Sequence, residues 1–173
     1  MDDRRKTSTM TLSVLAVLCV IGLVFGLKAV TADFPELTAA EEPACEARDF
    51  SAGDKVRVGD VAVSVYNAGS SSGAASKTMT QLIERGFGRG DSGNAPKGTK
   101  VRSAQIWADD AKDPAVRLVR RQLGRGTKIV PDKDTLGPGV VIVLGNGFNK
   151  LNANAPKAVK AGTDVTICSP PLE

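Results

Sequence analysis

The sequence contains no histidine among its 173 residues. Histidine is the usual general base near neutral pH and the commonest metal ligand. Its absence excludes the Ser-His-Asp and Cys-His catalytic arrangements. The three cysteines, Cys19, Cys45 and Cys168, lie too far apart in sequence to suggest a four-cysteine zinc site. We therefore expect no metal, no cofactor and no catalytic residues, and we expect that the protein is not an enzyme.

Aromatic residues are also scarce, with one tryptophan, one tyrosine and five phenylalanines. The core must therefore be built mainly from valine, leucine, isoleucine and alanine. The apolar share of 42% and the charged share of 24% are those of a globular chain, which argues against wholesale disorder. The length suits one ordinary domain together with a membrane segment.

Charge is missing altogether between Met10 and Leu27. As a helix this run extends roughly 27 Å, close to the thickness of a hydrocarbon core. Arg4, Arg5 and Lys6 precede it, so the N-terminus is expected in the cytoplasm and the rest of the chain outside. The predicted organisation is a cytoplasmic tail (1–8), a single transmembrane helix (9–30), an extracytoplasmic stalk (31–54) and an outer domain (55–173).

A cleaved signal peptide is the alternative interpretation of the same segment, with small residues before Ala32 that suit a cleavage site. The apolar run is longer than that of most signal peptides, which favours a retained anchor and a single-pass protein of the cell membrane. Cys19 lies inside the run and is interpreted as a small apolar side chain of the helix.

The outer region shows three apolar strand patterns at 61–66, 99–107 and 140–144, and a shorter one at 164–168. An apolar helical face is predicted over 74–85, with Gly86 after it, and a second helix begins at Asp113-Pro114 and ends at Gly124. The glycine-rich stretch 88–93 follows a helix and opens none, so it predicts a turn. The order β-α-β-β-α-β predicts an α+β, ferredoxin-like sandwich, with two helices on one face of an antiparallel or mixed sheet.

A glycine- and serine-rich loop connects the first of these strands to the first helix. It forms a candidate ligand-binding loop that comprises Asn67, Gly69, Ser70, Ser71, Ser72 and Gly73. The G-x-S-x-G pattern would present Ser71 as a nucleophile, but the sequence offers no histidine to accept its proton. Backbone amides at the helix N-terminus would suit an anion. The simplest alternative is a flexible turn in which Ser72 caps the helix.

Basic residues are only weakly concentrated. Four of the 23 flank the apolar run, which leaves a net charge of about +2 beyond it, and no nucleic-acid partner is expected. Seven basic residues could form a patch for an anionic polymer: Lys97, Lys100, Arg102, Arg117, Arg120, Arg121 and Arg125. Lys100, Arg102, Arg117 and Arg121 are its candidate binding residues. Ordinary solvated faces of a strand and a helix are the competing explanation.

Cys45 and Cys168 bracket the outer domain, where oxidation is favourable. We predict a disulfide between them, with two free thiols as the alternative. Such a bond would connect the C-terminal segment to the base of the stalk.

Residues 61–87, VAVSVYNAGSSSGAASKTMTQLIERGF, resemble the opening of the LytR C-terminal domain, and weaker similarity extends over 56–148. The resemblance includes Asn94, the strand 99–107 and the run 140–145 followed by Phe148. Asn146 and Gly147 stand where the family often carries an acidic residue. The single helix, stalk and flanking cysteines are similar to small membrane-anchored members from actinobacterial-type envelopes. Longer relatives also carry a LytR-CpsA-Psr catalytic domain, for which this chain has no room.

The resemblance implies an envelope location without transferase activity, and it supplies no catalytic residues. We therefore expect a non-enzymatic, membrane-anchored envelope protein that binds cell-wall glycopolymer, peptidoglycan or wall-assembly proteins and supports envelope integrity. One alternative is a scaffold for membrane protein complexes. Another is an atypical envelope enzyme that uses Ser71 or the cluster Asp109, Asp110 and Asp113.

Overall fold

The computed structural model describes residues 16–21, 23, 45–131 and 136–171 and divides the chain into two units, 1–40 and 41–173. In the first unit, residues 16–21 and 23 are helical. No helix among the described residues is long and apolar enough to cross a membrane. The predicted cytoplasmic tail, most of the predicted span 9–30 and the stalk residues 31–44 lie outside the described residues.

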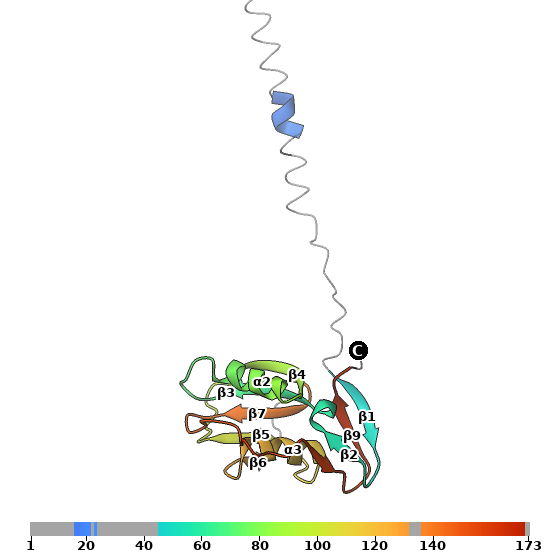
Figure 1. Ribbon diagram of the computed structural model, residues 1–173. Helices are drawn as coiled ribbons and strands as arrows, with labels where there is room; N and C mark the ends of the chain where they lie inside the picture. Colours follow the sequence, from blue (N-terminus) through green and yellow to red (C-terminus); the bar gives the residue numbers. More distant parts are fainter. Residues whose placement is uncertain (1–15, 22, 24–44, 132–135, 172–173) are drawn as a thin grey trace, which may run out of the picture. The chain divides into compact units, whose positions relative to one another are not determined.

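The second unit is an α+β domain with one five-stranded sheet and two short antiparallel ribbons (Figure 1). In chain order its elements are β1 (Glu46–Phe50), β2 (Lys55–Arg57), the 3-10 turn η1 (Val58–Asp60), β3 (Ala62–Asn67), α2 (Ala74–Glu84), β4 (Gly88–Asn94), β5 (Ala104–Trp107), α3 (Pro114–Leu123), β6 (Lys128–Val130), β7 (Val140–Leu144), β8 (Ala158–Lys160) and β9 (Val165–Ser169). The five-stranded sheet has the order β4-β3-β7-β5-β6.

Two β-α-β units form the outer parts of this sheet. β3 and β4 are parallel neighbours joined by α2, and β5 and β6 are parallel neighbours joined by α3. β7 completes the sheet between them, parallel to β3 and antiparallel to β5. Each unit thus joins adjacent strands, unlike a ferredoxin-like sheet, so the α+β class and the mixed sheet are observed but the predicted strand order is not.

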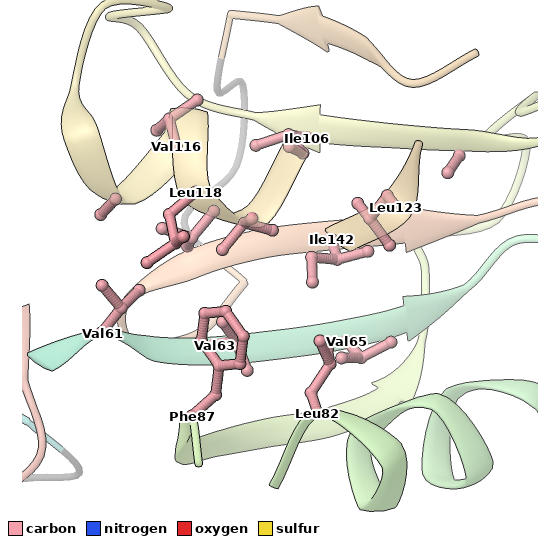
Figure 2. Packing of buried hydrophobic residues seen from close by; sticks show 14 of the residues in the cluster. Val61, Val63, Val65, Leu82, Phe87, Ile106, Val116, Leu118, Leu123 and Ile142 are labelled. Atoms are coloured by element: carbon pink, nitrogen blue, oxygen red, sulfur yellow. The ribbon is translucent and has the colours of Figure 1, made fainter. Parts of the chain in front are cut away.

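Both helices cover the same face of the sheet, as predicted. β3 and β5 run in opposite directions, and their β-α-β units extend to opposite edges of the sheet. Right-handed connections in both units therefore place α2 and α3 on the same face. Valine and isoleucine side chains of β3, β5 and β7 meet the two helices in one core (Figure 2). Its fully buried members include Val63, Val65, Met79, Leu82, Ile106, Leu118, Val119 and Ile142.

The opposite face has a smaller core built on Tyr66, Val141 and Val143. The segment that precedes β7 crosses this face, where the Tyr66 hydroxyl donates to the carbonyl of Leu136 and the Ser64 hydroxyl donates to the carbonyl of Pro138, 2.7 Å away. Burial, together with the negative charge of Asp91, raises the pKa of Tyr66.

The glycine-rich stretch 88–93 belongs to edge strand β4, so the predicted turn is wrong. A Cβ at Gly90 would lie 2.5 Å from the Ser64 hydroxyl oxygen and 3.0 Å from the Pro138 carbonyl oxygen. The Asp91 amide also donates to the Ser64 hydroxyl, at 3.0 Å. Glycine is therefore required at position 90 because both the neighbouring strand β3 and the segment before β7 pass directly against it.

The folded domain begins earlier than residue 55. Residues 46–50, which the sequence assigns to the stalk, form β1 and pair antiparallel with β9 near the other end of the chain. Phe50 of β1 packs against the main core, and Arg48 forms a 3.2 Å ion pair with Asp60. The partner of β1 lies more than 100 residues away, so local sequence patterns did not reveal this strand.

Candidate functional site

Helix α3 carries most of the candidate site, and its local sequence explains where it begins. Asp113 is the N-cap, and its Oδ1 accepts a hydrogen bond from the Ala115 amide at 2.7 Å. Pro114 occupies the first helical position, as predicted. The apolar face then packs against the sheet, which directs Arg120 and Arg121 to the exposed side.

The acidic residues before α3 organise the chain at this helix start. Burial raises the pKa of Asp113, and the charge of Asp110 adds to this effect, while hydrogen bonds from the Ala115 and Val116 amides oppose it. Asp110 itself accepts from the Lys112 amide at 2.7 Å. No three acidic or cysteine side chains in the described ranges are grouped as metal ligands. These contacts identify a capping role for Asp113.

The segment after β7 closes over the last turn of α3. The Asn152 amide donates to the carbonyl of Gln122 at 2.7 Å, and the Asn152 side-chain amide donates to the carbonyl of Arg121 at 3.2 Å. Gln122 is only 2% exposed, and its side-chain amide donates to the Pro156 carbonyl at 2.8 Å. Asn152 thus satisfies carbonyl groups that the helix end would otherwise leave without partners.

A cavity of about 430 Å³ lies between α3 and this segment. We call it the arginine cavity; it is lined by Arg117, Arg120, Arg121, Gly124, Arg125, Asn152, Asn154 and Pro156. In the described part of the chain, no carboxylate lies within 4.0 Å of these four guanidinium groups, and the ion pair there is between Arg48 and Asp60. The Arg117 side chain donates to the Lys160 carbonyl at 3.4 Å.

Two physical explanations for these arginines act together. Arg120 and Arg121 lie in the last turn of α3, where positive charge offsets the helix dipole. That effect accounts for basic residues near a helix end but not for a cavity that collects four of them. Guanidinium groups bind carboxylates and phosphates through two parallel hydrogen bonds. The cavity therefore has the chemistry of a site for anionic groups.

The predicted basic patch is rearranged in the structure. Arg117 and Arg121 line the same cavity, whereas Lys100 and Arg102 do not. Arg102 lies beside the turn after β7, where its carbonyl accepts from the Gly147 amide at 2.8 Å. Arg120 and Arg125, which are also among the basic residues named for the patch, line the arginine cavity as well. Arg125 follows Gly124, which ends α3 with a φ of +98°.

The predicted ligand-binding loop lies at the carboxyl ends of β3 and β7. The amide and hydroxyl of Ser70 donate to the side-chain oxygen of Asn146, at 2.6 and 3.1 Å. Asn67 bonds the amide of Gly69 and the carbonyl of Ser71, at 3.0 and 2.9 Å. These contacts connect the loop to the turn after β7 and already engage two of its amides. Binding of a ligand there stays a prediction.

The helix that follows this loop begins differently from the expectation. Gly73, with a φ of +75°, is the N-cap of α2, and no side chain caps it, so the predicted Ser72 cap is wrong. Ser71 is exposed, and its hydroxyl has no hydrogen-bond partner among the described residues. Nothing in this part of the chain activates it as a nucleophile.

The predicted disulfide between Cys45 and Cys168 is confirmed, with their Cα atoms 5.2 Å apart. Cys45 directly precedes β1, and Cys168 lies in β9. The bond therefore secures the ribbon in which the two ends of the domain meet.

The chain matches the family model described as "LytR cell envelope-related transcriptional attenuator" over residues 60–148, more than half of its length. The protein belongs to the LytR C-terminal domain family. The matched region runs from the end of η1 to just past β7 and includes both β-α-β units. The Asn152 to Pro156 side of the arginine cavity lies beyond it.

Among solved structures, the soluble domain of a conserved hypothetical secreted protein from Mycobacterium marinum is similar at 22% identity and a TM-score of 0.48. The similarity covers 61% of this chain and 79% of that one. No curated protein matches the chain significantly.

Proposed function

We propose that the domain is a non-enzymatic envelope module that binds an anionic cell-wall polymer at the arginine cavity. The observation that carries this proposal is the gathering of four guanidinium groups around one cavity without a carboxylate within 4.0 Å in the described chain. Arginines that no described carboxylate neutralises attract an external anion, and their planar groups suit phosphate or carboxylate. Membership of an envelope-related family fits a role in the cell envelope.

The disulfide supports an extracytoplasmic position for the domain. Disulfides persist in oxidising compartments and are rare in the cytosol, so the Cys45–Cys168 bond fits an exported domain. We propose further that residues 9–30 anchor this domain in the membrane, as the uncharged run from Met10 to Leu27 suggests. Retention of the full chain in the membrane pellet after alkaline carbonate extraction would support the anchor. Release into the supernatant would contradict it.

Co-sedimentation with purified cell walls tests the binding proposal. We expect the full chain to sediment with native walls, and much less with walls from which the anionic polymer has been removed by mild acid. The variant Arg121→Gln/Arg125→Gln removes two exposed cavity charges and should reduce binding about tenfold. Equal binding to native and stripped walls would refute the proposal.

A matched control keeps this experiment specific. Lys77→Gln/Arg89→Gln removes the same number of charges from exposed positions on α2 and β4 that do not line the arginine cavity. It should bind walls like the parent protein. If both double variants lose binding equally, the interaction follows net charge and the cavity is not the site.

The scaffold and enzyme alternatives have separate tests. Crosslinking in cells that captures proteins and no glycan would favour a scaffold. The variant Ser71→Ala tests the enzyme hypothesis, because full complementation of a null strain by this variant would remove its proposed nucleophile. We expect full complementation, since Ser71 has no base beside it in the described structure.

A further inference from the structure

The arginine cavity continues into two further hollows on the same surface. The second, of about 520 Å³, shares Gly124, Arg125 and Asn152 with the arginine cavity and adds Lys150 and Leu151. The third, of about 430 Å³, shares Lys150 and Leu151 with the second. It ends at the last turn of α2, where Gln81, Glu84 and Arg85 line it. The shared residues place the three hollows side by side, and we call them together the basic groove.

Hydrogen bonds connect the elements that line the groove. One guanidinium nitrogen of Arg85 donates to the side-chain oxygen of Gln122 at 2.7 Å and to the Asn152 carbonyl at 2.8 Å. These bonds join α2, α3 and the segment after β7 at one point. Leu151 and Leu123 are buried beside it, at 6% and 7% exposure. The groove is therefore shaped by the folded domain before any ligand arrives, which lowers the entropic cost of binding.

The charge of the groove is nearly of one sign. Its basic lining residues are Arg85, Arg117, Arg120, Arg121, Arg125 and Lys150, and Glu84 at the α2 end is its acidic one. Among the described residues, no aromatic side chain lines any of the three hollows. Single-stranded nucleic acids rely on aromatic stacking of their bases, so the lining favours a polyanion without aromatic rings.

We infer that the basic groove binds a linear anionic glycan lengthwise, with charged groups of successive repeats meeting the arginine cavity and the Lys150 hollow in turn. This inference rests on the proposed function and adds a length requirement to it. A ligand with one charged group occupies one hollow. A longer chain that is bound in one hollow holds its next charged group close to the second hollow, so the effective concentration there is high and the overall affinity rises. Affinity is expected to rise with chain length and then level off once the groove is filled.

Oligogalacturonates of defined length provide the probe, because the groove presents arginines and a lysine to any regularly charged linear glycan. Binding to the full chain in neutral detergent is measured by calorimetry for monogalacturonate, a short oligomer and a long oligomer. We expect the long oligomer to bind at least about tenfold tighter per molecule than the short one. Raising the salt concentration should weaken the long oligomer most, since more of its contacts are between charges.

Two variants distinguish lengthwise binding along the groove from anion binding at the arginine cavity alone. Lys150→Gln should weaken the long oligomer about threefold and leave the short one unchanged, while Arg121→Gln/Arg125→Gln should weaken both. The control Arg89→Gln should weaken neither, because Arg89 is exposed on β4 and lines none of the three hollows. Circular dichroism of each variant checks that the domain is folded.

The outcomes are distinct. If short and long oligomers bind equally and Lys150→Gln has no effect, the groove is overturned and the arginine cavity stands. If no oligomer binds, the groove and the proposed function both fail. If an unstructured oligonucleotide of the same charge binds more tightly than the long oligogalacturonate, the assignment of a glycan is overturned.

Discussion

Removing the disulfide should lower the stability of the domain by close to 5 kcal/mol. The bond joins Cys45 to Cys168, which are 123 positions apart, so it closes nearly the whole domain into one loop. On the chain-entropy model, a loop of this length costs the unfolded chain about 4.9 kcal/mol of entropy at room temperature. The double variant Cys45→Ser/Cys168→Ser removes this restriction and keeps side chains of similar size.

The local structure indicates why the effect should approach this upper value. β1 and β9 pair over five residues, and Phe50 of β1 packs against the main core. The Ser169 hydroxyl donates to the Asp60 carbonyl at 2.7 Å, which holds β9 against the turn before β3. Because β1 and β9 come from opposite ends of the domain and both contact its core, we expect the β1–β9 ribbon and the rest of the domain to unfold together.

Urea unfolding followed by tryptophan fluorescence measures the difference, since Trp107 is the single tryptophan and lies in β5 of the main sheet. At an m-value of about 2 kcal/mol/M, the midpoint should fall by about 2 M or more. The parent protein in reducing agent should match the double variant. A midpoint change that corresponds to less than about 1 kcal/mol would refute the reasoning and show that the ribbon opens independently of the sheet.

Three further predictions follow from individual side chains. Gly90→Val should destabilise the domain by at least about 2 kcal/mol, measured by thermal unfolding, because its Cβ would meet the Ser64 hydroxyl at 2.5 Å; a parent-like melting temperature would contradict the packing described. Gln122→Leu should cost about 1 to 3 kcal/mol, because the Pro156 carbonyl loses its partner and the Arg85 guanidinium loses one of two. An unchanged urea midpoint would contradict this. Asp113→Asn keeps a capping oxygen but removes the titrating group. The free energy of unfolding of the variant should therefore rise relative to that of the parent as pH rises from about 3 to 7. A constant difference in unfolding free energy across that range would contradict a raised pKa for Asp113.

The sign of the Asp113 effect follows from proton linkage. Its pKa is raised in the folded state, mainly by burial, so the folded protein holds this proton at pH values where the unfolded chain has released it. The stabilisation that Asp113 contributes is therefore fully present at pH values below its pKa in the unfolded chain, and it is lost as pH rises through its pKa in the folded protein.

Elements with a local signal were predictable from sequence. Val140–Leu144 is a continuous apolar run and forms the buried strand β7, and α3 begins at the Asp113-Pro114 signal. Gly86, with a φ of +97°, follows α2 as predicted. In each of these cases the physical cause lies within a few residues of the element itself.

The features that sequence analysis missed depend on distant partners. β4 is rich in glycine and resembles a turn, but its pairing with β3 and the crossing segment before β7 make it a strand. The strand order likewise depends on which strands pair across the sheet. For the site, the cavity arginines were all among the basic residues named for the patch, while the far wall of the cavity requires Asn152 to contact the end of α3. No local pattern encodes that contact.

The bond between Cys45 and Cys168 also determines how the protein responds to mechanical load. When the two ends of the chain are pulled apart, tension passes from position 45 to position 168 through the sulfur atoms and bypasses the residues between them. The sheet, the helices and the basic groove therefore stay outside the path of the force.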